Sequence, residues 1–283
     1  MKNGLVLEGG AMRGLFTAGV LDALMRGGVG FDGAVGVSAG AAFGCNLKSR
    51  QIGRVLRYNL RFCRDWRYAS WRSRWLTGDF FGAEFCYRKL PEELDPFDAA
   101  EFARNPMEFH LVCTDIERGE ALYRRCDDAG TETMEYMRAS ASMPLVSRMV
   151  KIVGKRLLDG ALSDSIPLEY FERLGFDRNV VVLTQPPGYV KTPTLALTLL
   201  KLVYRRYPRV VELAKSRHAR YNAQLEYVRK AENSGRALVI RPEKALPIGR
   251  ICHDPEAIRA VHRLGVEAAE KRLEEIRDFL RRG

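Results

Sequence analysis

Short apolar runs alternate with helical patterns through the first two-thirds of this chain, and this alternation constrains the fold more than any other feature. Residues 5–7 and 34–37 have the pattern of buried strands. Each is followed by a glycine-containing turn and then by a helical pattern, over residues 15–26 and 39–47. Strands interleaved with helices usually form a parallel sheet that is covered on both faces. The sequence therefore predicts a three-layer α/β/α fold with a mainly parallel central sheet.

A change in composition near residue 185 divides the chain into two parts. A breaker cluster, Gln185-Pro186-Pro187-Gly188, is followed by long helical patterns. Residues 1–185 carry a net charge of +1 and residues 186–283 carry +10, nearly all of the +11 of the chain. We expect an α/β domain over residues 1–185 and a basic, mostly helical C-terminal extension over residues 186–283. The further elements that we predict are strands at 109–113, 121–123, 149–153, 180–183 and 237–240, and helices at 52–66, 131–139, 168–174, 194–206, 208–233 and 254–281.

The composition excludes several other classes of protein. With 46% hydrophobic and 29% charged residues in a chain of 283, the protein is globular rather than disordered. The six cysteines show neither a CxxC pair nor the spacing of zinc ligands, so we predict no metal site and a reducing compartment. The longest uncharged stretch, residues 33–47, is too short to cross a bilayer, and the first apolar run ends at Glu8, too early for a signal peptide. We therefore expect a cytoplasmic protein.

Ser38 lies in a Gly-x-Ser-x-Gly motif between a predicted strand and a predicted helix. In this position the motif forms a sharp turn that lifts the serine hydroxyl out of the sheet, close to the amide N–H groups of a helix N-terminus. Flanking glycines relieve the crowding that such a turn causes. The same pattern is also compatible with a serine that only caps a helix. The motif consists of Gly36, Val37, Ser38, Ala39 and Gly40.

A glycine-rich loop follows the first predicted strand. Successive glycines allow backbone N–H groups to turn toward one point, which suits an anion or the oxyanion of an acyl-transfer reaction. The loop lacks the GxGxxG order of a dinucleotide-binding loop and the GK[ST] ending of a P-loop, although an ordinary tight turn is also compatible with it. Arg13 could steady this loop, hold an anionic head group, or pair with Glu8 or Asp32. The loop consists of Gly9, Gly10, Ala11, Met12, Arg13 and Gly14.

Asp159 ends another apolar run and is followed by Gly160 and Ala161. A carboxylate at the end of a strand, before a turn of small residues, can project from the edge of the sheet. The Asp-Gly pair also commonly forms an Asx-turn with no chemical role. The residues themselves leave both interpretations open.

Together and in this order, the three motifs resemble those of the patatin-like phospholipase family of lipid acyl hydrolases. The resemblance covers roughly residues 3–185 and includes residues 139–144, which look like the family's segment before the catalytic aspartate. Ala11 and Ala161 stand where many members have glycine. The resemblance implies a three-layer α/β/α domain, followed here by a helical extension like that of one bacterial branch of the family.

The resemblance further implies a Ser–Asp dyad that works without histidine. Ser38 would attack an acyl ester, Asp159 would accept its proton, and amides of the loop from Gly9 to Gly14 would hold the oxyanion before water releases the fatty acid. The apolar neighbours of Asp159 would raise its pKa and make it a better base. No cofactor is implied, and the expected substrate is an acyl lipid or another acyl ester.

Two alternatives stand beside this interpretation. An α/β-hydrolase-type esterase or thioesterase would need a histidine after Asp159, and His218, His253 and His262 are available. All three lie in the basic extension beside charged residues, where we expect solvated surface positions. The other alternative is a non-catalytic lipid- or phosphate-binding module that keeps the glycine loops.

A basic stretch with aromatic residues at its end bears on the partners of the protein. Arginines recur every three or four residues over 50–64, and Trp66, Trp71 and Trp75 follow. This pattern is typical of a helix that contacts an anionic membrane with tryptophan at the head-group level. It is also compatible with a solvated helix face whose aromatic neighbours lie in the core. The interleaved charges of the extension and the lack of a nucleic-acid-binding motif argue against a nucleic-acid partner.

Overall fold

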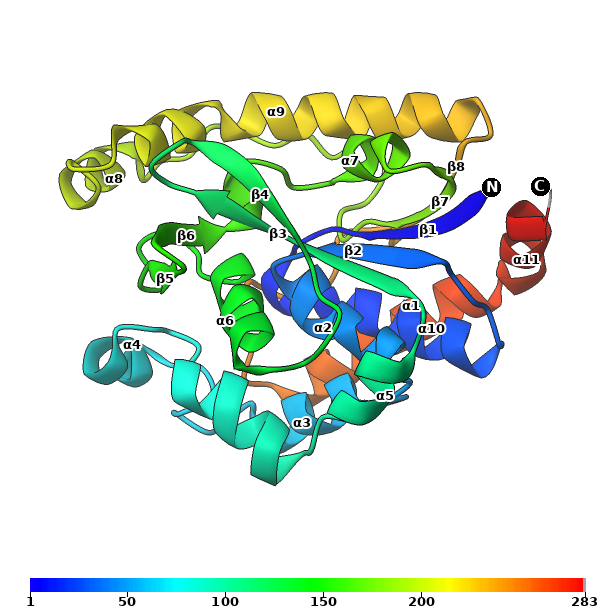
Figure 1. Cartoon of the computed structure of the whole chain (residues 1–283), viewed down its shortest axis with the longest axis horizontal. Coiled ribbons are helices and arrows are strands. Elements are labelled where there is room, and N and C mark those ends of the chain that lie inside the picture. The colour runs from blue at the N-terminus through cyan, green and yellow to red at the C-terminus, as the bar shows by residue number, and fades with distance from the viewer. Residues whose placement is uncertain (282–283) are drawn as a thin grey trace.

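The computed structural model describes residues 1–281 and has a central eight-stranded sheet with helices on both faces (Figure 1). Neighbouring strands follow the order β5 (Val150–Ile152), β6 (Lys155–Asp159), β3 (Glu108–Asp115), β2 (Gly33–Val37), β1 (Lys2–Leu7), β7 (Phe176–Val182) and β8 (Ala237–Ile240), and β4 (Glu120–Arg125) also pairs with β3. The pairs from β3 through β2, β1 and β7 to β8 are parallel, whereas every pair that includes β4, β5 or β6 is antiparallel. The predicted three-layer fold with a mainly parallel sheet is confirmed.

The helices lie between and after these strands. The α-helices are α1 (Gly14–Arg26), α2 (Ala39–Lys48), α3 (Arg54–Phe62), α4 (Trp71–Thr77), α5 (Ala99–Arg104), α6 (Thr131–Ser140), α7 (Leu168–Arg173), α8 (Leu197–Val203), α9 (Pro208–Asn233), α10 (Pro255–Glu270) and α11 (Leu273–Arg281). Short 3-10 turns, η1 (Ala11–Arg13) and η3 (Gly160–Leu162), and a π-helix, η2 (Phe85–Leu94), complete the set. Within residues 1–281, no helix combines the length and the apolar character that crossing a bilayer requires.

Alternating side chains of the central strands fill two separate cores. Leu5 and Leu7 of β1 belong to the core that also contains α1, α2 and α10, whereas Val6 belongs to the core under α7 and α9. This division follows from the pleat of a strand, which directs successive side chains to opposite faces. In Figure 1, α7 and α9 lie on one side of the sheet, and α1, α2 and α10 lie on the other. Every central strand is therefore buried on both faces.

The C-terminal extension completes the sheet and covers part of it. Strand β8 pairs in parallel with β7, and α10 packs against α1. The two helices approach closely because each has a glycine at the contact. A Cβ atom on Gly19 would lie 2.0 Å from the carbonyl oxygen of His262, and one on Gly265 would lie 2.0 Å from that of Phe16. The boundary between residues 185 and 186 stays a prediction, but the residues after it share the central sheet.

Replacing Gly19 with alanine is expected to destabilise the protein by about 2–3 kcal/mol, because the added methyl group must push α1 and α10 apart. Urea denaturation at constant pH measures this change in the free energy of unfolding. Gly30→Ala is the matched control, since a Cβ atom at Gly30 meets no atom within 4 Å. Equal stabilities of the two variants would contradict tight packing of α1 on α10.

Several predicted helices have other bounds in the structure. The helix predicted over 52–66 is α3, which begins only after Gly53, whose φ of 74° does not fit a helix. The pattern over 194–206 yields only α8, and the pattern over 254–281 is interrupted by a turn at Lys271–Arg272 that separates α10 from α11. Helices α4 and α5 and the π-helix η2 were not predicted.

Candidate active site

Ser38 occupies a strained turn between β2 and α2. Its backbone has φ 56° and ψ −121°, a conformation that residues other than glycine rarely adopt. The flanking glycines are required by close backbone contacts: a Cβ atom on Gly36 would lie 2.4 Å from the Gly40 oxygen, and one on Gly40 would lie 2.4 Å from the Leu7 oxygen. Val37 ends β2 and Ala39 begins α2, as the motif predicts.

Asp159 lies at the end of β6 and faces Ser38. The Oγ atom of Ser38 donates a hydrogen bond of 2.7 Å to Oδ2 of Asp159. The other oxygen, Oδ1, accepts a hydrogen bond of 2.8 Å from the backbone N–H of Ala161. Asp159 therefore caps the turn at Gly160, as the structural interpretation expects, and also contacts the serine, 121 residues away in sequence. Both side chains are buried, with Ser38 7% and Asp159 3% exposed.

Burial determines the protonation behaviour of Asp159. Because a charged carboxylate loses its hydration there, its pKa is raised above the usual value. The hydrogen bonds from Ser38 and from the Ala161 amide act in the opposite direction, as does the positive charge of Arg217 on α9. A carboxylate with a raised pKa is a stronger base than a solvated aspartate, and it already accepts the Ser38 hydrogen bond.

The glycine-rich loop packs directly against the turn at Ser38. A Cβ atom on Gly9 would lie 3.0 Å from Cβ of Ser38, and one on Gly14 would lie 2.8 Å from Cβ of Ala39. Gly10 is in similar contact with Thr184 at the end of β7. Ala11 has φ 50°, a conformation that explains why glycine would also fit this position. The loop, η1 and the start of α1 thus lie beside the serine.

Arg13 forms neither of the ion pairs that its position suggested. Glu8 accepts hydrogen bonds from the N–H and hydroxyl of Thr184 and from the hydroxyl of Tyr221, and Asp32 accepts one from the amide of Asn3. The pairing of Arg13 with Glu8 or Asp32 is therefore wrong. Its charge still acts on Glu8, although burial dominates and raises the pKa of that carboxyl.

Ser140, which sequence reasoning did not single out as a site residue, ties the site together. Its hydroxyl accepts a 3.0 Å hydrogen bond from the backbone N–H of Ser38 and donates one of 2.6 Å to the Val112 oxygen. In addition, the amide of Asp159 donates to the Ser142 oxygen at 2.9 Å. The last residue of α6 and the segment that follows it therefore connect the serine turn to the aspartate turn.

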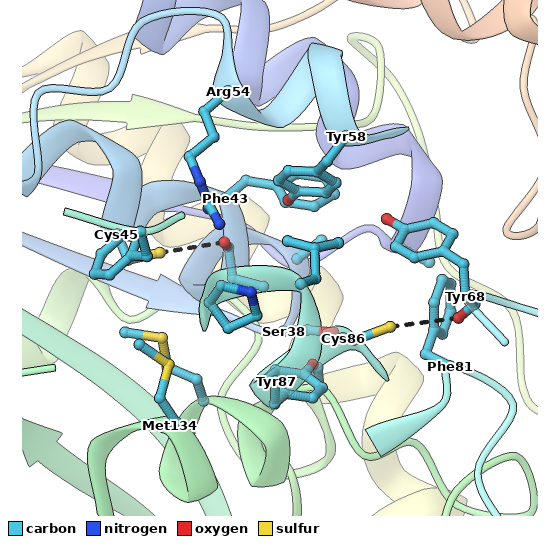
Figure 2. A pocket seen from close by; sticks show the side chains of 18 of the residues that line it. Ser38, Phe43, Cys45, Arg54, Tyr58, Tyr68, Phe81, Cys86, Tyr87 and Met134 are labelled. Carbon is cyan, nitrogen blue, oxygen red and sulfur yellow. Dashed lines mark hydrogen bonds between the residues drawn. The ribbon is translucent and has the colours of Figure 1, made fainter. Parts of the chain in front are cut away.

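An apolar pocket opens beside Ser38. Figure 2 shows the serine among aromatic and sulfur-containing side chains. The π-helix η2 forms one wall, and α2, α3 and α6 contribute the others. Such a lining suits an acyl chain far better than a polar ligand. The larger lining side chains are Met12, Phe43, Tyr58, Tyr68, Phe81, Tyr87, Leu90, Pro91, Phe97, Met134, Met137 and Met143.

Most of the arginine stripe over 50–64 is exposed, but three of its side chains also contact the C-terminal end of η2. Arg54 is buried, with its Nε 3.3 Å from Oδ1 of Asp95, and Arg57 contacts the same carboxylate at 2.7 Å. Arg61 donates to the Leu94 oxygen at 2.8 Å. These arginines therefore fasten α3 to the C-terminal end of η2 and support the pocket wall. The tryptophans lie outside the core, with Trp71 69% and Trp75 90% exposed.

Three of the four histidines form contacts elsewhere, and the buried Nδ1 of His218 has no hydrogen-bond partner. His110 lies beside Tyr170 and Glu108, His253 beside the Cys63 oxygen, and His262 bonds Asp22 at 2.9 Å. His262 is buried between α10 and α1, so the expectation of a surface position is wrong for it. Within residues 1–281, neither Ser38 nor Asp159 forms a hydrogen bond with a histidine, and no group of three metal-ligand side chains is found.

Two protein-family models match parts of the chain. The model of the family described as patatin-like phospholipase matches residues 5–172, and that of a domain of unknown function, DUF6363, matches residues 207–281. The first match includes all three motifs. The second lies entirely within the basic extension.

The individual relatives share less than a third of their residues with this chain over the matched regions. An uncharacterised protein of Escherichia coli K12, YjjU, is 28% identical over 280 residues, covering 92% of this chain and 74% of that protein. Lysophospholipase nte1 of Aspergillus niger is 29% identical over 180 residues, which is 62% of this chain but only 11% of that protein. Among solved structures, VipD from Legionella pneumophila aligns with a TM-score of 0.47 and 12% identity, over 97% of this chain and 67% of that one.

Proposed function

This chain belongs to the patatin-like phospholipase family, and on that premise we propose that it is a serine hydrolase that releases fatty acid from phospholipid or other acyl esters. The observation that carries the proposal is the hydrogen bond from Ser38 Oγ to Asp159 Oδ2 at 2.7 Å. The apolar pocket beside Ser38 suits an acyl chain. The name of the fungal relatives, lysophospholipase, points to the same class of substrate.

In the proposed reaction, Ser38 Oγ attacks the ester carbonyl carbon while its proton passes to Asp159. The tetrahedral oxyanion is held by backbone amides of the loop from Gly9 to Gly14, each of which contributes ~3–4 kcal/mol in comparable enzymes. The carbon–oxygen bond to the alcohol then breaks, and Asp159 returns the proton to that oxygen. Water attacks the acyl-serine in the same way, gives its proton to Asp159 and releases the fatty acid, after which Ser38 recovers its proton.

Two assays together test this proposal. A fluorophosphonate probe reacts with an activated serine, so labelling separates an enzyme from a non-catalytic lipid-binding module. A panel of esters with graded acyl chains, measured beside intact phospholipids and lysophospholipids, then defines the substrate. We expect labelling, and hydrolysis that rises with chain length as the apolar pocket fills. A folded protein that neither reacts with the probe nor cleaves any ester would refute the proposal.

The pH profile is expected to reflect the raised pKa of Asp159. Only the ionised carboxylate accepts the serine proton, so kcat/KM falls on the acid side at a pH above 3.8, the ordinary value for aspartate. Because the charge of Arg217 lowers this pKa, Arg217→Gln should shift the acid limb to higher pH. Arg209→Gln, at the start of the same helix, is the control. An acid limb that does not move in Arg217→Gln would show that Asp159 is not the group whose ionisation sets this limb.

We also propose that the protein contacts anionic membranes through α4 and α8 rather than through the arginines of α3. Both helices lie at the same end of the molecule (Figure 1). They are joined through Leu145, whose oxygen accepts from Arg74 of α4 and whose N–H donates to Tyr204, at the end of α8. Large apolar side chains of this surface are exposed: Trp71, Trp75, Leu76, Leu195, Leu199, Leu202 and Val203.

Charge and position both suit a lipid surface. Exposed cations, Arg72, Lys201, Arg205 and Arg206, lie on or next to the two helices and complement anionic head groups. The loop that contains Leu145 also contains Ser142, whose oxygen accepts a hydrogen bond from the amide of Asp159. Contact with a membrane would therefore bring lipid to the side of the molecule where the dyad lies.

Replacing both Trp71 and Trp75 with alanine is expected to weaken binding to vesicles that contain phosphatidylglycerol by at least tenfold. Burying one large apolar side chain contributes ~1.5–3 kcal/mol, and 1.4 kcal/mol is a factor of ten. Vesicle flotation at low salt measures the change. Leu264→Ala, which removes an exposed apolar side chain from α10, is the control. Undiminished binding by the double variant would show that these tryptophans do not form the membrane contact.

A further inference from the structure

Four cationic side chains gather around the glycine loop and the aspartate turn without acidic partners. They are Arg13 of η1, Lys191 in the loop before α8, Arg217 of α9, and Arg250 before α10. Among residues 1–281, no carboxylate oxygen lies within 4.0 Å of their side-chain nitrogens. Three of the four come from the basic extension. Within residues 1–281, most of the other arginines do have such a partner.

Arg217 brings one positive charge to the aspartate turn. Its Nε donates a 2.6 Å hydrogen bond to the oxygen of Ala161, two residues after Asp159. Its charge reaches the Asp159 carboxyl and lowers the pKa of that group, against the larger effect of burial. The long helix α9 thus fixes a guanidinium group next to the residue that binds Ser38.

Lys191 is linked to the start of the glycine loop through Tyr221. Asn222 of α9 clamps its backbone, accepting from the N–H at 2.8 Å and donating to the oxygen at 3.0 Å. The Lys191 ammonium lies 4.7 Å above the ring of Tyr221, whose hydroxyl bonds Glu8 at the start of the loop. A short chain of contacts therefore holds Lys191 beside Gly9.

These charges are close enough to act on one another. Burial, with the charges of Arg217, Arg250 and Arg13, lowers the pKa of Lys191 to about 8. Glu8 and Asp159 act on Lys191 and Arg217 through their charges, but neither carboxyl forms an ion pair with the group, since their oxygens bond Thr184, Tyr221, Ser38 and Ala161. The Nε of Arg13 is buried and has no hydrogen-bond partner. Arg13, Lys191 and Arg217 are partly buried, whereas Arg250 is exposed. Partly buried cations without an ion-pair partner are costly unless an anion joins them.

We propose that Arg13, Lys191, Arg217 and Arg250 form a binding site for a phosphate group beside Ser38. The assignment to a substrate rests on the proposed function: the acyl chain would occupy the apolar pocket and the phosphate of a phospholipid or lysophospholipid would meet the four cations. Free phosphate offers the same chemistry as a second source. The site gives the basic extension a role in recognising an anionic ligand, since it supplies three of the four side chains.

A matched pair of substrates tests the site. Monodecanoylglycerol and its 3-phosphate carry the same acyl ester and differ only in the phosphate. We expect the wild-type protein to prefer the phosphate ester, and the double variant Lys191→Gln/Arg250→Gln to lose at least tenfold of this preference, mainly through a higher KM for the phosphate ester. Lys215→Gln/Lys230→Gln, which removes two exposed charges from α9, should keep the wild-type preference.

A binding measurement separates this proposal from the proposed function. Calorimetric titration of the Ser38→Ala protein with inorganic phosphate needs no turnover, and the Lys191 and Arg250 substitutions can be added to it. Binding that these substitutions abolish supports the site even if no ester is hydrolysed. If the ester preference is absent but that binding is present, the site holds free phosphate. The proposal would be overturned if the protein showed no preference for the phosphate ester and also did not bind phosphate.

Discussion

Replacing Ser38 with alanine is expected to lower kcat/KM for every ester substrate by at least about 1,000-fold and to abolish labelling by a fluorophosphonate. The variant lacks the oxygen that bonds Asp159 at 2.7 Å, and the loop amides alone cannot form an acyl-enzyme. The fold should be retained, because alanine keeps the Cβ atom that already tolerates φ 56° and the backbone N–H that bonds Ser140. Kinetics, probe labelling and thermal unfolding measure the three effects.

A matched serine variant keeps this experiment specific. Ser49, another buried serine just after the far end of α2, bonds Asn46 and Gln51 rather than an acid. Ser49→Ala should remain active and should still react with the probe. If Ser38→Ala were folded and still labelled, the nucleophile would be another residue and the proposed mechanism would fail.

Local patterns were sufficient for the parts of the fold that depend on local structure. Strand β8 and helix α9 have the predicted bounds because each is a periodic run between clear breakers. The π-helix η2 was not predicted, because Pro91 inside it removes a backbone donor and interrupts any α-helical pattern. Its position depends on distant partners, such as the contact between Phe85 and Phe62, which no local pattern encodes.

The same distinction applies to the site. Ser38 and Asp159 could be identified because each lies in a short motif at the end of a strand. Arg54 could not be placed, because the periodicity of the arginines predicts a stripe but not the acid that it meets, Asp95, 41 residues later. Arg217 and the aromatic lining of the pocket likewise depend on tertiary packing. Sequence motifs thus predicted the candidate pair of Ser38 and Asp159, whereas the side chains around this pair had to be observed.

Replacing Asp159 with asparagine is expected to abolish turnover, again by at least about 1,000-fold, while the fold stays intact. Asparagine matches aspartate in size, and its oxygen can still accept from the Ala161 amide, but it cannot take the proton of Ser38. Ester hydrolysis and circular dichroism of the same preparation measure the two effects. An active, folded asparagine variant would show that another group is the base.

Stability should change in the opposite direction from activity. The raised pKa of Asp159 means that the folded state disfavours the ionised carboxylate relative to the unfolded state. This destabilisation is absent below the unfolded value near 3.8, grows as pH rises toward the folded value, and is complete above it. Asparagine removes it. The variant should therefore be at least as stable as the wild type at pH 7, and this difference should disappear in acid.

Histidine variants decide between the dyad and a triad. A Ser–Asp dyad predicts that His218→Ala, His253→Ala and His262→Ala all retain kcat, although the last should lower the unfolding temperature because His262 is buried against Asp22. His218 is the most informative, since it adjoins Arg217, which contacts the aspartate turn. Loss of activity in a folded His218→Ala protein, together with activity in Asp159→Asn, would assign the base to histidine. The opposite pair of results leaves Asp159 as the only acceptor for the serine proton.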